Sequence, residues 1–432
     1  MRGGIGAAIG FLCAAAAAPA PAQEAAAPGE PWRADLHQLA AELPRLHKDL
    51  FFLQPREEWE ARVADLDAAL DGLEEHEIVV EFMRLVASVG DGHTAIRLGQ
   101  GPVARKVFPV EFHPFSDGLH VVVAPRELSW AVGARVTAVG GLPIDTAWTR
   151  VAEIIAHDNE AGLLAAVPQH LETAWVPHAL GFGDTRERAT FTVVTGSGEE
   201  RALELGPGSP AALGRVGVEP KELPRWRRRR AEPYWFELAP AERLLYLQYN
   251  RCADDPQRPF AALVEELAAA VAAFGVAETP PIETFLIDLR GNGGGNSLVL
   301  QPLLRLLGNQ RALREKGVLF VAIGESTFSS AMMNAVELRR GFGALLVGTP
   351  TGGKPRSYGE IKFLKLAHSQ LEVSYSTKFF ELVADDAPSV LPDLAAPAAL
   401  AHWQEGRDPA LEAIAAWRAQ RGAGGGASSG GQ

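Results

Sequence analysis

The chain contains little cysteine and no long hydrophobic run, and each shortage excludes a class of protein. Two cysteines in 432 residues are too few for a disulfide-rich scaffold or for a metal site with several cysteine ligands. No apolar stretch reaches the roughly 18 residues that a membrane-spanning helix requires. The net charge of −12 argues against a general nucleic-acid binder, which needs a basic face. The remaining composition, 47% hydrophobic and 22% charged, is that of an ordinary globular protein with several domains.

The first residues have the pattern of a targeting segment. Residues 5–18 form an apolar run, and Ala20-Pro21-Ala22 then gives the small-x-small sequence typical of a cleavage site. We therefore predict a Sec-type signal peptide over residues 1–22 and a periplasmic or secreted protein. Cys13 leaves a lipoprotein as an alternative. Cleavage after the signal would leave Cys252 without a second cysteine, so no intramolecular disulfide could form.

The hydrophobic pattern changes twice along the chain. Apolar residues recur every three or four positions within residues 32–100, which predicts an N-terminal helical subdomain. Residues 105–206 carry short β-branched runs between glycines, which predicts a small β subdomain with a helix over 146–157. Its stretch 132–141 resembles the glycine and valine pattern of a PDZ module, and a generic β subdomain is the alternative.

Strands and helices alternate over residues 241–420, which is typical of a βα core with a largely parallel sheet. The strands are expected at 244–249, 284–289, 318–323 and 344–347, with helices near 260–274, 297–307 and 330–340. Residues 207–240 are predicted to be a connector, and residues 421–432 a flexible tail. The connector carries an arginine-rich run at 225–230, which could bind an anion or form a solvated linker.

A glycine-rich loop follows the expected strand at 284–289. Its sequence is Asp288-Leu289-Arg290-Gly291-Asn292-Gly293-Gly294-Gly295. Glycines let the backbone turn sharply and point N–H groups at an anion, although they serve an ordinary strand-to-helix turn equally well.

A serine-rich segment, Thr327-Phe328-Ser329-Ser330, follows the next expected strand and leads into a helix. A serine in such a place is commonly a helix cap. Its hydroxyl would also lie beside free backbone donors and the positive end of a helix dipole, where a nucleophile is useful.

A histidine stands in the glycine-flanked turn Gly90-Asp91-Gly92-His93-Thr94. Most of the 11 histidines in the chain are expected to be ordinary surface or core residues. The flanking glycines would let this backbone approach another segment closely, which favours His93 as a functional residue.

Together these segments resemble the tail-specific (carboxyl-terminal processing) serine protease family, and they are closer to its tricorn-like branch, which uses a histidine base. The glycine loop resembles the family's "D-x-R-x-N-x-G-G" stretch, residues 327–331 its "T-x-S-[SA]" segment, and residues 90–94 its "D-G-H-T" segment. Residues 389–393 resemble the closing "G-x-x-P-D", with a serine in place of the glycine. The resemblance covers about residues 32–417. It implies an α/β fold in which a crotonase- or ClpP-like catalytic core carries a PDZ-like subdomain and an N-terminal helical cap.

The resemblance also implies a role for each matching residue. Ser329 would be the nucleophile, and His93 would take its proton and return it to the leaving amine. The backbone N–H of Ser330, with that of Gly293 or Gly294, would form the oxyanion hole.

Two departures from the family pattern leave the base and its partner open. Gly92 stands where tricorn relatives have a serine that orients the histidine. Lys354 follows Ser329 by 25 residues and resembles the "T-x-G-K" segment of the branch that uses lysine as base, since a desolvated lysine can serve that purpose. The candidates for an orienting acid, which the sequence does not rank, are Glu360, Asp385 and Asp386.

The sequence therefore predicts an exported serine-type endopeptidase that forms an acyl-enzyme on unfolded or terminal peptide segments. We expect a peptide or protein substrate, no nucleic acid, and no metal or organic cofactor. Residues 348–355 nearly fit a phosphate-binding P-loop, but Pro355 lacks the hydroxyl that a magnesium ion needs. A non-catalytic peptide- or ligand-binding protein on the same fold is the alternative, because fold does not fix function. Oligomeric state and cleavage preference are left open.

Overall fold

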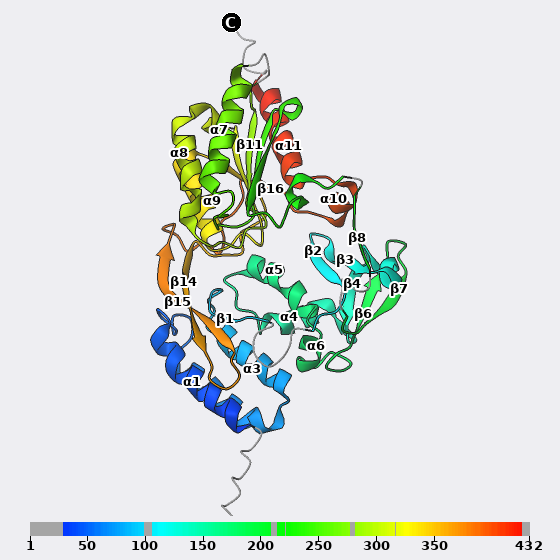
Figure 1. Cartoon of the computed structure of the whole chain (residues 1–432). Coiled ribbons are helices and arrows are strands. Elements are labelled where there is room, and N and C mark those ends of the chain that lie inside the picture. Colours follow the sequence, from blue (N-terminus) through cyan, green and yellow to red (C-terminus); the bar gives the residue numbers. More distant parts are fainter. Residues whose placement is uncertain are drawn as a thin grey trace, which may run out of the picture.

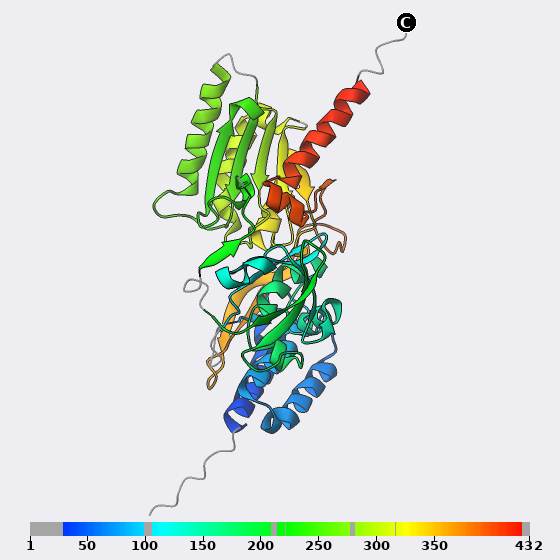
Figure 2. The ribbon, with the colours of Figure 1, turned by 90° about the vertical axis from the view of Figure 1, so that its right-hand side faces the viewer.

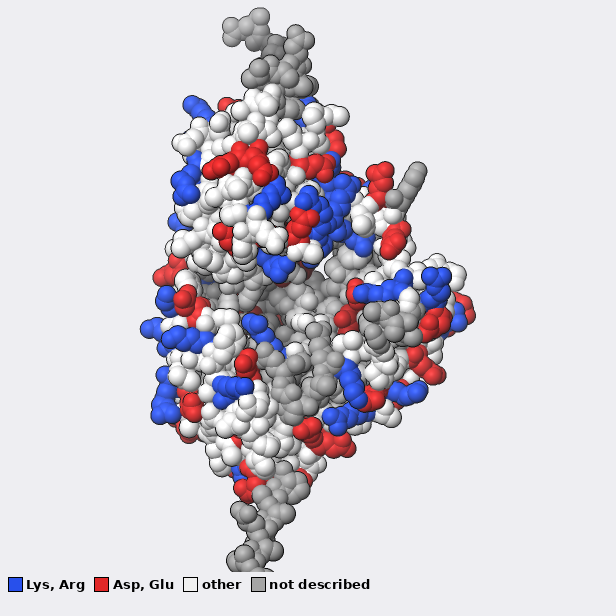
Figure 3. Space-filling model, in the orientation of Figure 1, with Lys and Arg blue, Asp and Glu red and all other residues white. Residues whose placement is uncertain are grey.

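The computed structural model describes residues 29–98, 106–208, 214–220, 222–276, 281–315 and 317–425. The signal segment predicted over residues 1–22 lies outside the described residues. The described residues form two halves (Figure 1): those within 234–355 and 382–425 form an upper half, and those within 29–217 and 356–381 form a lower half. Charged side chains of both signs are interspersed over the face shown in Figure 3. The mixed α/β architecture with several sheets agrees with the prediction.

A six-stranded sheet forms the centre of the upper half, in the order β16-β13-β12-β11-β10-β9. All neighbours pair in parallel except β9, which is antiparallel to β10. The strands are β9 (Tyr234–Ala239), β10 (Leu244–Tyr249), β11 (Thr284–Asp288), β12 (Leu319–Ile323), β13 (Leu345–Gly348) and β16 (Leu394–Ala395). The four strands expected from the sequence are confirmed. β9 lies inside the segment that was expected to be a connector.

Helices cover both faces of this sheet, which explains why β10, β11 and β12 are buried along their whole length. One face packs against α7 (Phe260–Val276), α8 (Gln301–Asn309) and α9 (Ser330–Phe342). The other face packs against α11 (Pro409–Gly425), and Figure 2 shows α7 and α11 on opposite sides of the strands.

The lower half combines helices with a second sheet in the order β2-β3-β4-β6-β7. Its strands are β2 (Glu111–Phe115), β3 (Gly118–Pro125), β4 (Arg135–Val139), β5 (Leu142–Pro143), β6 (Ala189–Val194), β7 (Glu200–Leu205) and β8 (Arg215–Gly217). Its helices are α1 (Glu30–Leu46), α2 (Arg56–Ala69), α3 (Glu75–Ala87), α4 (Ile144–Ala152), α5 (Glu160–Leu171) and α6 (Val176–Ala179). The helix expected over 146–157 therefore begins and ends earlier than the sequence suggested.

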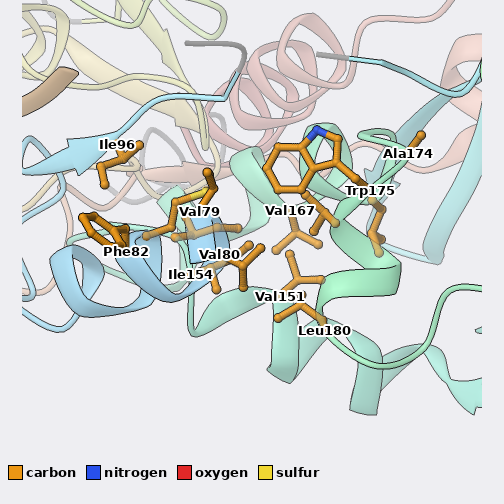
Figure 4. Packing of buried hydrophobic residues seen from close by; sticks show 14 of the residues in the cluster. Val79, Val80, Phe82, Ile96, Val151, Ile154, Val167, Ala174, Trp175 and Leu180 are labelled. Carbon is orange, nitrogen blue, oxygen red and sulfur yellow. The ribbon is translucent and has the colours of Figure 1, made fainter. Parts of the chain in front are cut away.

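The N-terminal helices and the second sheet share one hydrophobic core. Figure 4 shows Val79 and Val80 of α3 close to Ile154, which lies just beyond the C-terminal end of α4, with Val151 of α4 next to it. The two expected subdomains of the lower half thus stabilise each other through common buried surface.

A long hairpin links the halves. It consists of β14 (Arg356–Lys365) and β15 (Glu372–Glu381), and β15 also pairs with β1 (Ala95–Ile96). The chain leaves the upper half in β14, contributes Leu364 and Val373 to the core of the lower half, and returns in β15. Because β1 directly follows the turn that holds His93, this pairing sets where the turn lies. The remaining short elements are α10 (Leu400–Glu405), η1 (Leu70–Gly72), η2 (Arg126–Ala131), η3 (Arg225–Arg227), η4 (Pro240–Glu242), η5 (Ser297–Leu300) and η6 (Arg311–Arg314).

Candidate active site

Ser329 has a strained backbone immediately before α9. Its φ of 50° and ψ of −127° are unusual for a residue with a side chain. It occupies the N-cap position, yet its side chain makes no capping hydrogen bond. The ordinary reason for a serine at a helix start therefore does not apply, and the hydroxyl is left for another task.

The segment before Ser329 is fastened to the end of β11. The Thr327 hydroxyl donates to the carbonyl oxygen of Leu289 at 2.8 Å and accepts from the N–H of Gly324 at 3.0 Å. The N–H of Phe328 donates to the carbonyl oxygen of Asn292 at 3.1 Å. These bonds join the two sequence motifs of the upper half into one rigid unit.

The glycine loop approaches Ser329 so closely that a side chain would not fit. Gly294 has a φ of 103°, and a Cβ at this position would lie 2.8 Å from Cβ of Ser329. The N–H of Gly294 donates to Oδ1 of Asn292 at 2.9 Å, so it is already engaged. Among the described residues, the N–H groups of Gly293 and Ser330 have no hydrogen-bond acceptor, as expected for Ser330 in the first turn of α9.

Ser330 has a second contact that the sequence did not indicate. Its hydroxyl donates to the carbonyl oxygen of Gly295 at 2.6 Å. The side chain of Ser330 therefore holds the glycine loop against the start of α9.

Asp91 shapes the turn that carries His93. Its side chain is fully buried, and Oδ1 accepts from the N–H of His93 at 3.0 Å. Oδ2 accepts from the hydroxyls of Thr94 at 2.5 Å and Ser376 at 2.6 Å, and it lies 3.1 Å from Nε2 of His47. Burial alone would raise the pKa of Asp91, but the hydrogen bonds from His47, Ser376 and Thr94 outweigh it and lower the pKa.

The ring of His93 lies against the residue that precedes Ser329. It stacks on Phe328 with the ring centroids 4.4 Å apart and the planes at 29°. Nδ1 of His93 is 3.8 Å from Oδ1 of Asp91, and the side chain is 11% exposed. Neither ring nitrogen makes a hydrogen bond within the part of the chain that the structure describes. The ring is thus held by packing, and its nitrogens are not engaged by these residues.

One pocket of about 500 Å³ contains the sequence-predicted residues of both halves. Its lining includes His93, Ser329, Ser330, Gly293 and Gly294. The edge strand β14 supplies further lining residues, and the apolar part of the wall is formed by Phe328, Ile361, Met332, Met333, Phe380 and Leu382. The structure therefore brings the predicted nucleophile, base and oxyanion donors to one cavity.

Lys354 lines a different cavity. This second pocket, of about 570 Å³, lies behind the His93 turn and includes Gly90, Asp91 and Asp158. The contact that Lys354 makes there is through its backbone N–H, which donates to Oδ2 of Asp158 at 3.3 Å. The structure does not place Lys354 in the Ser329 pocket.

The three candidate acids are dispersed. Glu360 lines the Ser329 pocket, but its side chain is 57% exposed and lies 3.8 Å from the Lys378 ammonium. Asp386 lines the cavity behind the His93 turn, and Asp385 lines neither pocket. Buried Asp158, in the loop between α4 and α5, was not indicated by any motif because it lies 65 residues beyond His93 and the predicted helix ended beside it.

Two general features complete the description of the site. Over the described ranges, no helix combines the length and apolarity that crossing a membrane would take. Within the same residues, no group of three or more His, Cys, Asp or Glu side chains is arranged to hold a metal ion.

The fold has relatives among solved structures. Mature CPAF in complex with lactacystin matches with a TM-score of 0.59 and 15% identity, over 90% of this chain and 97% of that one. The chain shares its fold with CPAF. A CPAF variant with one serine changed to alanine matches with a TM-score of 0.60 and 14% identity, over 87% of this chain and 95% of that one.

The photosystem II D1 C-terminal processing protease also matches, at 14% identity over 88% of this chain and 98% of that one. Its TM-score is 0.41, below the level that indicates a shared fold. No protein-family model and no curated protein matches the chain. The CPAF matches cover both halves of the molecule. The sequence resemblance to tail-specific serine proteases is therefore confirmed at the level of the fold.

Proposed function

We propose that the protein is a serine-type endopeptidase of the tail-specific kind, which hydrolyses peptide bonds through an acyl-enzyme on Ser329. The main support is the geometry of Ser329: a strained backbone, a hydroxyl that does not cap α9, and a pocket shared with His93. Strain of this kind is concentrated at functional sites. The fold shared with CPAF over nearly the whole chain is consistent with this proposal.

Each step of the reaction has a residue to perform it. His93 accepts the proton of the Ser329 hydroxyl as the oxygen attacks the peptide carbonyl carbon, and the tetrahedral oxyanion forms. The N–H groups of Ser330 and Gly293 bind that oxyanion, because the N–H of Gly294 is engaged by Asn292. The imidazolium returns the proton to the leaving amine. Water then attacks the acyl-enzyme with His93 again as base, which releases the carboxylic acid and regenerates the hydroxyl.

His93 is the proposed base, with Lys354 as the alternative from the sequence. The stacking of His93 on Phe328 puts its ring beside the nucleophile segment, whereas Lys354 lines the cavity behind the turn. The carboxylate of Asp91, 3.8 Å from Nδ1 of His93, supplies a negative charge that favours the imidazolium.

Peptide docking is proposed for the second sheet, the region with a PDZ-like sequence pattern. A groove of about 360 Å³ lies between the edge strand β2 and α5, with Ala165 and Gln169 on one wall and Phe112 on the other. Residues Glu325 and Ser326 of the upper half reach the same groove. An extended peptide added to β2 would therefore run toward the segment that carries Ser329.

The remaining assignments follow the sequence. We propose an exported protein whose signal segment is removed after Ala22, an N-terminal helical cap over residues 32–100, and a crotonase-like catalytic core over residues 241–420. Sequencing the N-terminus of the exported protein tests the cleavage site, and Gln23 is the expected first residue.

The decisive experiment for the function is hydrolysis of an unfolded protein and of short peptides by Ser329→Ala. The hydroxyl does not cap α9, so its loss should leave folding unchanged and reduce turnover by at least about a thousandfold, as removal of a triad member does. Ser197→Ala is the matched control, because Ser197 is exposed in the turn between β6 and β7 and lines neither the Ser329 pocket nor the groove beside β2. Full activity in Ser329→Ala would contradict the proposal and favour a non-catalytic binding protein.

A further inference from the structure

Asp158 connects the His93 turn to the upper half. It lies in the loop between α4 and α5 and is 9% exposed. Oδ1 accepts from the N–H of Gly92 at 2.7 Å, and Oδ2 accepts from the N–H of Lys354 at 3.3 Å. A single buried carboxylate thus binds the residue beside His93 and a loop that belongs to the upper half.

The carboxylate of Asp158 explains why residue 92 is a glycine. A Cβ at position 92 would lie 2.8 Å from Oδ1 of Asp158 and 3.2 Å from its backbone nitrogen. The φ angle of Gly92 is outside the left-handed region, so backbone conformation does not demand a glycine here. The requirement comes from Asp158, which occupies the space that a side chain would need.

The neighbouring Asn159 anchors Asp158 rigidly. Its Oδ1 accepts from the N–H of Gly162 at 2.9 Å and so caps α5. Its Nδ2 donates to the carbonyl oxygens of Thr351 at 3.1 Å and Pro388 at 2.7 Å, both in the upper half. The loop is held from both halves, so the position of Asp158 is set independently of His93.

The charge around Asp158 differs from that around Asp91. Burial raises the pKa of Asp158, while the N–H of Gly92 and the charge of His93 partly counteract it; Asp91 adds to the rise. Among the described residues, two backbone N–H groups donate to this carboxylate, so a positive charge beside it is stabilised more strongly than one beside the better-satisfied Asp91. Within the residues that the structure describes, the titratable and charged groups around it are Asp91 and His93 on the turn, His47 behind Asp91, and Lys354, Arg356, Tyr358 and Asp386 around the adjoining cavity.

We propose that Asp158 is a positioning residue for His93, which holds the turn through Gly92 and stabilises the imidazolium by its negative charge. The inference rests on the proposed function, because Asp158 acts through His93 and the role of His93 as the base is part of that proposal. Asp91 fixes the turn from the lower half, and Asp158 ties the turn to the loop at Lys354, so the base is held from both halves.

The test compares Asp158→Asn with Asp145→Asn, an exposed carboxylate at the start of α4. In Asp158→Asn we expect kcat to fall by about ten- to a hundredfold, the cost of a small misplacement of a catalytic group, with KM for a short peptide unchanged. The acid limb of the kcat/KM profile should move to lower pH, because the imidazolium loses a neighbouring negative charge. Asp145→Asn should have the same kcat, the same KM and the same acid limb as the wild type.

A second variant keeps Asp158 but removes its contact. Gly92→Ala places a Cβ 2.8 Å from Oδ1 of Asp158, too close for the two atoms, so the carboxylate or the turn must shift. We expect it to shift the acid limb in the same direction as Asp158→Asn. If Asp158 had a merely structural role, both variants would have a lower melting temperature but the same acid limb of the kcat/KM profile as the wild type. An unchanged acid limb in both Asp158→Asn and Gly92→Ala would overturn the inference.

A titration of the His93 ring by NMR separates this inference from the proposed function. It is done in the Ser329→Ala background, where no turnover is needed. A lower titration midpoint in Asp158→Asn than in Asp145→Asn supports the inference, and equal midpoints contradict it. If Ser329→Ala itself hydrolyses peptides, the proposed function is wrong. The NMR comparison still decides whether Asp158 raises the titration midpoint of His93, because it does not depend on turnover.

Discussion

The upper and lower halves each hold a buried carboxylate beneath the site, and the two are balanced in different ways. In the upper half, Asp288 accepts from the hydroxyl of Tyr246 at 2.8 Å and from Nε of Arg290 at 3.1 Å. The guanidinium of Arg290 also donates to Asp408 at 2.8 Å and 2.9 Å. In the lower half, Asp91 is held by two hydroxyls, by His47 and by a backbone N–H. One network is an ion cluster, and the other consists mainly of neutral donors.

The two networks fix the two sequence motifs of the site: the glycine loop after Asp288 and the turn that carries Asp91 and His93. In the upper network the contact of Arg290 with Asp288 is local, but Tyr246 and Asp408 are 42 and 118 residues away from their partners. The lower network joins His47, Asp91 and Ser376, which are far apart in the chain. Both networks therefore combine local and long-range contacts, and they differ in chemistry: the nucleophile side depends on an ion cluster, and the base side on hydroxyl, imidazole and backbone donors.

The largest expected effect is on the ion cluster. Arg290→Met leaves two buried carboxylates without a cation, so the free energy of unfolding should fall by about 3–5 kcal/mol. Urea denaturation measures this. Arg407→Met is the control, because Arg407 pairs with Glu405 and Glu412 at the surface and should leave stability nearly unchanged. Equal losses in both variants would mean that the cluster contributes no more than a surface pair.

The next effect separates the two candidate bases. His93→Ala should reduce turnover by at least about a hundredfold, the usual size of a general-base contribution. Lys354→Ala should cost far less, because Lys354 lines the cavity behind the turn. Single-turnover hydrolysis at neutral pH measures both. The reverse ranking would assign the base to Lys354.

Asp91→Asn tests the lower network. The variant leaves donors without an anion to accept their hydrogen bonds, so the free energy of unfolding should fall by about 2 kcal/mol at neutral pH. The folded state lowers the pKa of Asp91 from its ordinary 3.8, so this stability is present above that pH and is lost as the pH falls through the lower folded-state pKa. Urea denaturation at several pH values should show a weaker acid dependence in the variant. An unchanged acid dependence would contradict this role.

Ser330→Ala should have a smaller effect. The backbone N–H in the proposed oxyanion hole is kept, but the hydroxyl no longer holds the carbonyl oxygen of Gly295. We expect turnover to fall by about tenfold, the equivalent of one ordinary hydrogen bond. A thousandfold loss, measured with the same short peptide, would mean that Ser330 and not Ser329 is the nucleophile.

The smallest expected effect is on the cleavage of long substrates, when the groove beside β2 is filled. Ala165 is exposed on its wall, so Ala165→Trp should fill the groove without disturbing the core. Cleavage of long substrates should fall a few-fold while cleavage of short peptides is unchanged. Equal rates on long substrates in variant and wild type would argue against docking there.

The sequence predicted the helical and β regions of the lower half as well as the strands and motifs of the upper half. Its strands are continuous apolar runs buried on both faces, and its motifs stand at strand ends, where local chemistry decides the structure. The sequence missed β14, because half of its residues are exposed and no alternating pattern marks it. It also missed Asp158, since the contact between Asp158 and Gly92 joins residues 66 apart. Such contacts depend on the packing of whole elements, which no local pattern records.

Covalent labelling by a serine-reactive phosphonate tests the central claim that the upper half supplies the nucleophile and the lower half the base. The wild-type protein should gain one adduct, located on Ser329 by peptide mass spectrometry. His93→Ala should be labelled at least about a hundredfold more slowly, because the hydroxyl loses its base. An adduct on Ser326 or Ser330, or labelling of His93→Ala at the wild-type rate, would contradict the account.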